Sequence, residues 1–348
     1  MDNCLNNCID IRCEDHVISR VFFGEKLQDA EILLKDYRDV HIVCDENVAY
    51  AARMLGGNAS SVTMIHAGEG EKTMETVIRI CTRLLQEGAD RSSLLLGIGG
   101  GITTDMAGFA ACIYKRGIRF GFIPTTLLSQ VDAGIGGKTG VNFLGYKNML
   151  GVIRQSEFTF ICPEPLSTLP RREFLCGAAE MLKTFIIDDR NGCYERAVRA
   201  LQGIDLGDEE QIRSLGELIR EAASVKAGIV SRDQFESGER RQLNLGHTFA
   251  HAIEKVSGGE IAHGEAVAMG IILAARLSDR ALEEKLKADF EACGLPAECP
   301  FPVQELAGAM ALDKKAEGNI IHFIVPERIG QVREMDLSAE GAVALLTR

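Results

Sequence analysis

The sequence predicts an α/β N-terminal domain of the doubly wound, Rossmann-like type, followed by a mainly α-helical C-terminal domain. Three observations predict this fold class. Short apolar, β-branched runs alternate with amphipathic stretches up to residue 163, a proline-rich segment then interrupts this rhythm, and the apolar residues beyond it recur at helical spacing. With 348 residues, 46% of them hydrophobic, the chain is long enough for two ordinary domains.

The N-terminal domain, residues 1–163, is expected to contain a mostly parallel sheet. Strands are expected where aliphatic and β-branched residues cluster, and helices in the amphipathic stretches between them. The predicted strands are residues 40–44, 62–66, 93–98, 118–123 and 157–161, and the predicted helices are residues 48–55, 72–87 and 104–114. Strands that alternate with helices in this way form parallel βαβ units. The first forty residues match no pattern that we can use.

The C-terminal domain, residues 164–348, is expected to be mainly helical. The segment CPEPLSTLP at 162–170 carries three prolines and marks the boundary. Beyond it, apolar residues recur at intervals of three and four, which predicts helices. The predicted helices are residues 172–187, 208–231, 245–257, 264–280 and 283–293. Residues 320–335 form the exception, because two short apolar runs flank a turn at Gly330 and predict a hairpin.

Composition excludes several classes of protein. The net charge of −12 argues against nonspecific nucleic-acid binding, which depends on neutralising phosphates. The apolar runs are much shorter than the roughly 20 residues that span a bilayer, so we expect no membrane segment. The polar N-terminus lacks a secretory signal, and the eleven cysteines include no CxxC pair. We therefore expect a cytoplasmic protein with reduced thiols.

A glycine-rich turn is the first candidate binding site. The segment GIGGGITTDMAGFAA at 97–111 follows an apolar strand and opens a helix of small residues. Glycines let the backbone approach a pyrophosphate, and a helix N-terminus supplies unpaired N–H groups. Ile102 stands where the third glycine of the GxGxxG pattern belongs, so a tight structural turn remains the alternative. The placement favours a dinucleotide.

Two neighbouring motifs are ambiguous. Asp45 and Asn47 follow a predicted strand, where they can accept hydrogen bonds from a ribose or cap the next helix equally well. The segment GIGGKTG at 134–140 contains GKT, but a phosphate-binding loop of NTPases requires glycine where Asp132 stands. We therefore reject an NTPase. Lys138 remains of interest as a cation among flexible glycines, and Lys147 and Asn148 lie nearby in the sequence.

A histidine cluster is the second candidate site. His247 and His251 are four residues apart and share a helix face, and His263 precedes the next apolar helix. A third ligand type is offered by Glu180, whose carboxylate on an apolar helix is costly to bury without a cation. Two histidines and one carboxylate form a catalytic zinc arrangement with open positions. The simpler alternatives are structural histidines and an ion pair between Glu180 and Lys183.

Several long motifs, in one order, make the chain resemble the 3-dehydroquinate synthase family of sugar-phosphate cyclases. The resemblance runs from about Asp45 to beyond Lys315. The motifs are GEGEK at 68–72, GGGITTDMAGF at 99–109, YKRGIRFGFIPTTLLSQVDAGIGGKTGVN at 114–142, KNMLG at 147–151, STLPRREFLCGAAEMLK at 167–183, NLGHTFAHAIE at 244–254 and HGEAVAMG at 263–270. The glycine loop departs from the family, since Thr103 and Thr104 replace an aliphatic residue and a glycine, which implies extra hydroxyls near the pyrophosphate.

The resemblance implies a site for each ligand. Glu180, His247 and His263 correspond to the ligands of one divalent metal ion, zinc or cobalt. The residues that correspond to the NAD site are Asp45, Glu69, Lys72, Gly100, Gly101, Ile102, Asp105, Thr125, Thr126, Lys138, Lys147, Thr168 and Leu169. Those that correspond to the substrate site are Asp132, Lys138, Asn148, Lys183, Lys226, Arg240, Asn244, His251 and one of Lys314 or Lys315. An arginine matching Arg116 reaches the neighbouring subunit's site in this family, which implies a homodimer.

The resemblance also implies a reaction. The family converts 3-deoxy-D-arabino-heptulosonate 7-phosphate to 3-dehydroquinate by transient oxidation with NAD, phosphate elimination, re-reduction, ring opening and aldol closure. Lys183 and Asp132 are candidates for proton transfer, and His251 for assistance at the phosphate. Positive charges that balance this anionic substrate come from Lys138, Lys226, Arg240, Lys314 and Lys315. We expect the metal to face the nicotinamide.

Three alternatives to this function remain. Another sugar-phosphate cyclase, such as 2-deoxy-scyllo-inosose synthase, shares the metal, the NAD and the fold, but Lys226, Arg240 and Asn244 favour a substrate with a carboxylate. A metal-dependent oxidoreductase of the glycerol dehydrogenase type accumulates NADH and has no need of so many cations. A regulatory protein that only binds metal or nucleotide is disfavoured by the presence of site residues in both halves.

Overall fold

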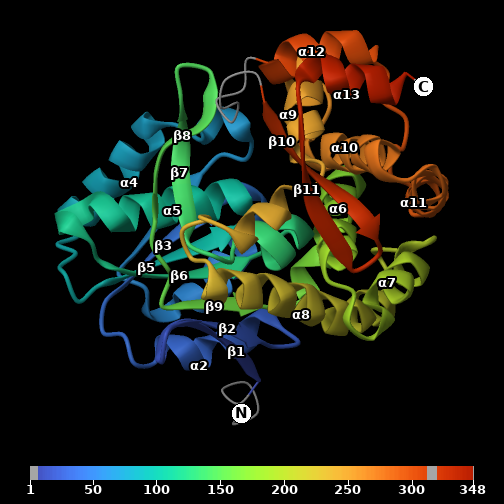
Figure 1. The fold of residues 1–348 in the computed structure, drawn as a ribbon. Helices are drawn as coiled ribbons and strands as arrows, with labels where there is room; N and C mark the ends of the chain where they lie inside the picture. Colours follow the sequence, from blue (N-terminus) through green and yellow to red (C-terminus); the bar gives the residue numbers. More distant parts are fainter. Residues whose placement is uncertain (1–6, 312–319, 348) are drawn as a thin grey trace. The chain divides into compact units, whose positions relative to one another are not determined.

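The computed structural model describes residues 7–311 and 320–347 of the chain (Figure 1). The chain divides into two compact units, each built from two segments. Unit 1 comprises Met1–Leu169 and Leu206–Phe235, and unit 2 comprises Pro170–Asp205 and Glu236–Arg348. None of the described helices combines the length and the apolar character that a membrane span needs.

Unit 1 contains a seven-stranded sheet that is parallel except at one edge. The strand order is β1-β2-β9-β6-β5-β3-β4, and only β1 runs antiparallel to its neighbour. The strands are β1 Cys8–Cys13, β2 His16–Phe23, β3 Val40–Asp45, β4 Ser61–Ile65, β5 Leu94–Gly99, β6 Arg119–Pro124 and β9 Phe158–Ile161. All five predicted strands are confirmed. The pair β1–β2 lies in the segment to which we assigned no pattern.

Helices cover both faces of this sheet, as the doubly wound prediction requires. Alternate residues of β3 enter different cores: Ile42 packs in the core with α3, whereas Val43 packs in the core with α4 and α5. The helices of unit 1 are α2 Glu31–Leu34, α3 Ala49–Leu55, α4 Met74–Gln86, α5 Gly101–Ile113 and α8 Glu209–Arg232. The predicted helices near residues 48–55, 72–87 and 104–114 are confirmed, with α5 beginning three residues earlier than predicted.

A hairpin follows the glycine-rich segment after residue 134. Strands β7 (Lys138–Phe143) and β8 (Tyr146–Ile153) pair antiparallel and lie beside α5 (Figure 1). A Cβ atom on Gly140 would lie 2.5 Å from the carbonyl oxygen of Leu150, so only glycine permits this close pairing. Lys138, which we described as a cation among flexible glycines, is the first residue of β7 and directly follows Gly136 and Gly137, both with positive φ.

Unit 2 is a helical assembly with one hairpin. Its helices are α6 Arg171–Ile187, α7 Cys193–Leu201, α9 His247–Val256, α10 His263–Ser278, α11 Arg280–Ala292, α12 Val303–Ala311 and α13 Ala339–Leu346, and its strands are β10 Ile321–Arg328 and β11 Gln331–Leu337. Helix α10 is buried along most of its length and packs against α6, α9, α11 and β10. The predicted hairpin is confirmed, and Gly330 takes the left-handed conformation at its turn, with φ of 84°. Helices α7, α12 and α13 were not predicted.

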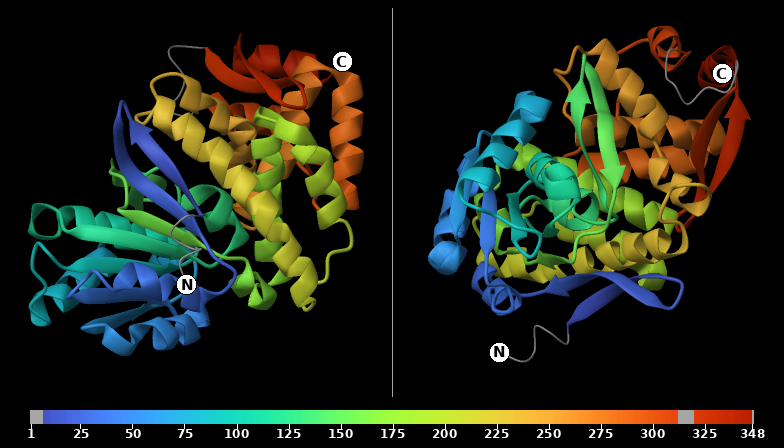
Figure 2. Two further views of the ribbon diagram at one scale, coloured as in Figure 1. Left: turned by 90° about the horizontal axis from the view of Figure 1, so that it is seen from below. Right: turned by 90° about the vertical axis from the view of Figure 1, so that its left-hand side faces the viewer.

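The helix predicted over residues 208–231 is present as α8, but it belongs to the first unit. It packs against β1 and against the turn Ser129–Ala133, and Figure 2 shows it running alongside β1. The domain division at residues 163 and 164 stays a prediction. The compact units of the structure differ from this division, because α8 packs against elements of unit 1 that precede it in the sequence.

Candidate functional site

A fully buried carboxylate lies at the centre of unit 2. Glu180 lies in the middle of α6 with 0% exposure, among Ala178, Ala179 and Met181, which are also buried. The ammonium nitrogen of Lys183, one turn later, lies 2.5 Å from Glu180 Oε2, and Lys183 itself is 1% exposed. The predicted ion pair is therefore present. Lys183 lies beside Oε2 of Glu180, and the other oxygen, Oε1, faces away from this lysine.

Glu180 Oε1 faces two imidazole rings. His247, the first residue of α9, places Nε2 3.7 Å from Oε1, and His263, the first residue of α10, places Nε2 3.3 Å from it. In both rings the other nitrogen has an acceptor nearby: His247 Nδ1 lies 3.2 Å from the Leu245 carbonyl oxygen, and His263 Nδ1 lies 3.3 Å from Glu254 Oε1. Protons on both Nδ1 atoms leave the Nε2 lone pairs directed toward Glu180.

These three residues fit one divalent cation. A tetrahedral ion with bonds near 2.1 Å holds its ligand atoms about 3.4 Å apart, and the observed separations of 3.3 and 3.7 Å lie on either side of that distance. All three ligand atoms lie within 4.8 Å of one another. Within the part of the chain that the structure describes, neither oxygen of Glu180 has a hydrogen bond of acceptable geometry, even though Lys183 Nζ is close to Oε2. A buried carboxylate of this kind is suited to a metal.

The electrostatics of the cluster favour positive charge beside Glu180. Burial opposes ionisation of Glu180, but Lys183 and the two histidines outweigh it and hold the pKa of this carboxyl well below its usual range. Burial and the charge of Lys183 hold the pKa of His247 well below its usual range. Burial also disfavours the charged form of His263, yet the carboxylates of Glu180 and Glu254 raise its pKa to about 9. The position that attracts this proton is the position a metal ion would occupy.

Close approaches of the backbone bring these ligands together. A Cβ atom on Gly264 would lie 2.2 Å from the Cα of Cys176, so α10 and α6 touch one turn before Glu180. Gly246, with φ of 75°, directly precedes His247, and a Cβ atom there would lie 2.8 Å from the backbone nitrogen of Ile271. Gly264 thus lets α10 approach α6, and Gly246 lets the start of α9 approach α10, at short range.

A second group of metal-ligating side chains lies on the hairpin β10–β11 and differs in character. His322, Glu334 and Asp336 are partly or fully exposed, and both carboxylates lie within 3.0 Å of the same imidazole nitrogen, Nδ1. His322 and Asp336 are direct partners across the hairpin. This geometry is typical of a cross-strand ion pair.

The remaining predicted residues of unit 2 differ in their contacts and burial. The ring of His251 lies 5.7 Å from that of His247, centroid to centroid, on the same helix. Arg240 is 2% exposed, and Asn244 donates a hydrogen bond of 2.9 Å to Glu236. Lys314 and Lys315 lie outside the described residues. Glu236 and Glu254 were not predicted; the signal that pointed to Glu254 was its place in the motif NLGHTFAHAIE.

In unit 1 the glycine turn opens α5 as predicted. Gly100 is the N-cap of α5, and the carbonyl oxygen of Gly99 accepts a hydrogen bond from the backbone N–H of Thr125, which directly follows β6. A Cβ atom on Gly100 would lie 3.1 Å from the Thr126 side chain, so the turn is closely packed. Thr104 is buried and its hydroxyl donates to the Gly101 carbonyl. The extra hydroxyls near the pyrophosphate stay a prediction, and that of Thr104 donates its proton within α5.

A buried lysine links three segments next to this turn. Lys72 Nζ lies 2.6 Å from Asp105 Oδ2 on α5 and 2.5 Å from Asn148 Oδ1 on β8. Burial raises the pKa of Asp105 despite the charge of Lys72. Glu69 lies in the same region and accepts a hydrogen bond of 2.7 Å from Asn142. The unpredicted hairpin thus carries a predicted substrate residue to two predicted NAD residues.

Helix α8 contributes a second lysine to unit 1. Lys226 forms an ion pair with the carboxylate of Asp132 and also donates a 2.6 Å hydrogen bond to the Asp132 carbonyl oxygen. Lys226 is 6% exposed. Two residues predicted for the substrate site therefore meet within one unit, although 94 residues separate them in the sequence.

The other predicted NAD residues are spread over several elements and loops of unit 1. Asp45 accepts a 2.8 Å hydrogen bond from the Asn47 backbone, which is the helix-capping alternative, and burial raises its pKa. Thr125 and Thr126 follow β6, and Thr168 and Leu169 are the last two residues of the first segment of unit 1. Ile102 is the second residue of α5, and Lys147 is exposed on β8.

Arg116 lies in a loop of unusual backbone conformation. Lys115, Arg116 and Gly117 have consecutive positive φ values of 48°, 66° and 115°. Side chains rarely adopt this left-handed conformation, so other contacts must hold it. Lys115 Nζ donates a 2.6 Å hydrogen bond to the Ala89 carbonyl, as does the hydroxyl of Tyr114 at 3.1 Å. The loop leaves the Arg116 side chain exposed.

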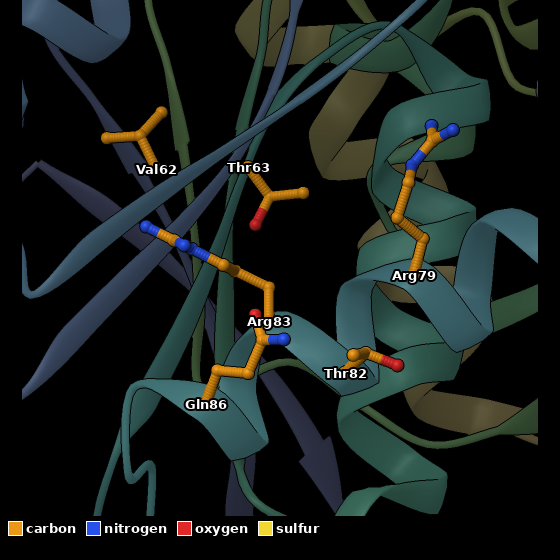
Figure 3. A pocket seen from close by; sticks show the side chains of 6 residues that line it. All are labelled: Val62, Thr63, Arg79, Thr82, Arg83 and Gln86. Atoms are coloured by element: carbon orange, nitrogen blue, oxygen red, sulfur yellow. The ribbon is translucent and has the colours of Figure 1, made fainter.

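One cavity of unit 1 involves none of the predicted site residues. It measures about 320 Å³ and is lined by Val62 and Thr63 of β4 and by Arg79, Thr82, Arg83 and Gln86 of α4 (Figure 3). Its arginines pair with neighbouring carboxylates, Arg79 with Glu71 at 2.7 Å and Arg83 with Glu87 at 2.8 Å. We assign no ligand to this cavity.

Comparison with known proteins identifies the family. The profile of the 3-dehydroquinate synthase N-terminal region matches residues 62–176, and that of the C-terminal region matches residues 177–316. The 3-dehydroquinate synthases of Pyrococcus abyssi and Thermococcus kodakarensis are 47% and 46% identical to the chain, over 82% and 77% of its length and 84% and 76% of theirs.

Solved structures agree with these sequence relatives. A 2-deoxy-scyllo-inosose synthase, complexed with carbaglucose-6-phosphate, NAD+ and Co2+, superposes with a TM-score of 0.85 at 25% identity, covering 97% of this chain and 99% of that one. A 2-epi-5-epi-valiolone synthase from Streptomyces hygroscopicus subsp. jinggangensis 5008, with NAD+ and Zn2+ bound, gives 0.83 at 27% identity, covering 96% and 97%. The chain therefore belongs to the 3-dehydroquinate synthase family.

Proposed function

We propose that this chain converts 3-deoxy-D-arabino-heptulosonate 7-phosphate to 3-dehydroquinate and phosphate, a step of the shikimate pathway. Membership of the family gives the reaction. The observation that carries the proposal to this chain is the buried cluster of Glu180, His247 and His263, whose ligand atoms have the spacing of a metal centre. Burying a carboxylate and two histidines together costs free energy, so a chain that kept the fold without the activity would not be expected to retain them.

The two cofactors of the proposed reaction are NAD and one divalent metal ion, zinc or cobalt. The NAD+ and metal bound to the two related cyclases support this assignment. In unit 1, the unpaired N–H groups at the start of α5 suit a pyrophosphate. In unit 2, Glu180, His247 and His263 would hold the metal, which as a Lewis acid supplies polarisation of the hydroxyl and of the ketone formed from it.

The side chains of this chain bind, orient and move protons. Lys183, held beside Glu180, is positioned to handle the proton of the substrate hydroxyl that is oxidised. The pair of Asp132 and Lys226 offers a second carboxylate and ammonium for proton transfer and substrate binding. Holding the ring-opened product in place makes the aldol closure intramolecular, which is worth an effective concentration of roughly 10⁵ M or more.

Charge matching supports an acidic substrate. Arg240 is nearly fully buried, and Lys226, which pairs with Asp132, is also buried. Cations that are kept out of water in this way recognise carboxylate or phosphate strongly. Arg240, Asn244 and Lys226 are the proposed carboxylate binders, while Lys138, Asn148 and His251 are proposed to bind the phosphate end of the substrate.

The protein is proposed to act as a homodimer in which Arg116 serves the site of the neighbouring subunit. The loop conformation supports this role, because the hydrogen bond from Lys115 to Ala89 helps to hold a loop that presents Arg116 on the surface. Two consecutive residues in the left-handed conformation are energetically unfavourable. A surface arginine without a specific role would not require them.

One assay tests the proposed function. Purified protein is incubated with the heptulosonate phosphate, substoichiometric NAD+ and Zn2+ or Co2+. We expect release of many equivalents of phosphate per NAD+ without net NADH, because the same cofactor re-reduces the intermediate. Conversion of the added NAD+ to NADH, after which the reaction stops, would instead identify an oxidoreductase. A hexose 6-phosphate, which lacks the carboxylate, serves as the second substrate, and faster turnover of it would identify another cyclase.

A further inference from the structure

We infer that Glu254 is a positioning residue that orients His263 toward the metal and sets how tightly the metal is held. This inference rests on the proposed metal centre and names a residue outside the ligand set. Metal-binding histidines usually donate their second ring N–H to an acceptor, which fixes the tautomer and raises the basicity of the ligand nitrogen.

The geometry supplies such an acceptor for His263. Glu254 Oε1 lies 3.3 Å from His263 Nδ1, while Nε2 of the same ring lies 3.3 Å from Glu180 Oε1. The ring therefore bridges two carboxylates, one on each nitrogen. With Glu254 accepting from Nδ1, the Nε2 lone pair is the one available to the metal.

Glu254 occupies a position that is unfavourable for a carboxylate unless a cation compensates. Its side chain is only 9% exposed, and it lies in the last turn of α9, which ends at Val256. Burial penalises the ionised form, and the negative end of the helix dipole repels it. A metal ion bound to the other nitrogen of His263 would place positive charge on this ring and offset both costs.

The two histidines are oriented by acceptors of different strength. His247 donates to the Leu245 backbone carbonyl at 3.2 Å, whereas His263 donates to a charged carboxylate. Hydrogen bonds to ionised acceptors are roughly twice as strong as those to neutral ones. His263 is also the more exposed of the two side chains, 36% against 13%, so it has more need of a partner that restrains it.

The test measures metal affinity rather than turnover. Metal-free wild type, Glu254→Gln and Glu254→Ala are titrated with Co2+ against a competing chelator, and the visible absorption of bound Co2+ is recorded. We expect affinity to fall by about 10- to 100-fold, with a changed Co2+ spectrum. Glu254→Ala should be weaker than Glu254→Gln, because glutamine keeps an oxygen that can accept the Nδ1 proton.

Glu283→Gln is the matched control. Glu283 is also a buried glutamate of unit 2, 6% exposed, but its partners are Arg276 and Arg280. We expect this variant to lose stability while it binds Co2+ with wild-type affinity and spectrum. Wild-type affinity and spectrum in both Glu254 variants would overturn the inference, as would an equal loss in Glu283→Gln. If wild type itself bound no Co2+, the metal centre of the proposed function would fall as well.

Discussion

At the scale of single residues, His263 links the metal cluster to its surroundings. Its Nε2 lies 3.3 Å from Glu180 and its Nδ1 lies 3.3 Å from Glu254. We predict that His263→Ala abolishes phosphate release and lowers the zinc content of the purified protein to well below one per chain. Elemental analysis and the phosphate assay check this together. Full activity with wild-type zinc content would contradict the assignment of His263 as a ligand.

Lys183 offers a more discriminating substitution. It is the cation next to the fully buried Glu180, so Lys183→Met removes one partner of a buried pair. We expect the metal-free variant to lose about 3 kcal/mol of unfolding free energy, since an uncompensated buried charge costs this much. We also expect Zn2+ to stabilise the variant more than it stabilises wild type, because the metal then replaces the missing cation. Turnover should be lost.

Denaturant titrations with and without Zn2+ measure both effects of Lys183→Met. Equal stability of the metal-free variant and wild type would show that the ion pair is not needed to hold Glu180 ionised. A smaller gain from Zn2+ in the variant than in wild type would show that Glu180 does not face the metal.

At the scale of helices and strands, contacts between backbones decide where the ligands lie. Gly264→Ala would place a Cβ atom 2.2 Å from the Cα of Cys176 and force α6 and α10 apart. We expect a loss of about 1–3 kcal/mol in stability together with weaker metal binding, because Glu180 and His263 separate. Gly308→Ala is the control: it is also helical, with nothing within 4 Å of the added atom, and it should be neutral or slightly stabilising. Unfolding curves and metal titration of both variants check the prediction.

The elements that were predicted correctly are those with strong periodicity. The strands β3, β4, β5, β6 and β9 and the helices α6, α9, α10 and α11 follow apolar patterns that only one conformation satisfies. The pair β7–β8 was missed because its segment is rich in glycine, a residue that is depleted in strands. At Gly140 the missing side chain permits the close pairing of the two strands. The edge strand β1 carries polar residues at alternating positions, so it gave a weak apolar signal.

The candidate metal site was predicted more completely than its supporting residues. Glu180 was identifiable because a lone carboxylate on an apolar helix requires a cation, and the histidines were identifiable by their clustering. The contact between Glu254 and His263 was not, since it joins the end of one helix to the start of the next across the loop 257–262. Likewise, no local pattern indicates that Lys226 of α8 meets Asp132, because only the tertiary fold brings them together.

At the scale of the whole molecule, the proposed homodimer predicts that two inactive chains restore each other. Arg116→Ala lacks the arginine given to the neighbour, and Glu180→Ala lacks a ligand in its own site. In a mixed dimer, the site of the Arg116→Ala chain keeps Glu180 and receives Arg116 from its partner. Random mixing should therefore restore about a quarter of wild-type activity. Activity that stays at the level of the separate variants after refolding together would argue that Arg116 acts within its own chain.

Helix α8 has a consequence for how the chain is made. The sheet of unit 1 is complete in sequence at β9, yet the helix that covers β1 is encoded after α6 and α7 of the other unit. At roughly 5–20 residues per second of synthesis, α8 is made some seconds after the last strand of the sheet. During that interval the nascent chain presents an apolar face to solvent, so folding on the ribosome is expected to be the stage at which this protein depends most on chaperones.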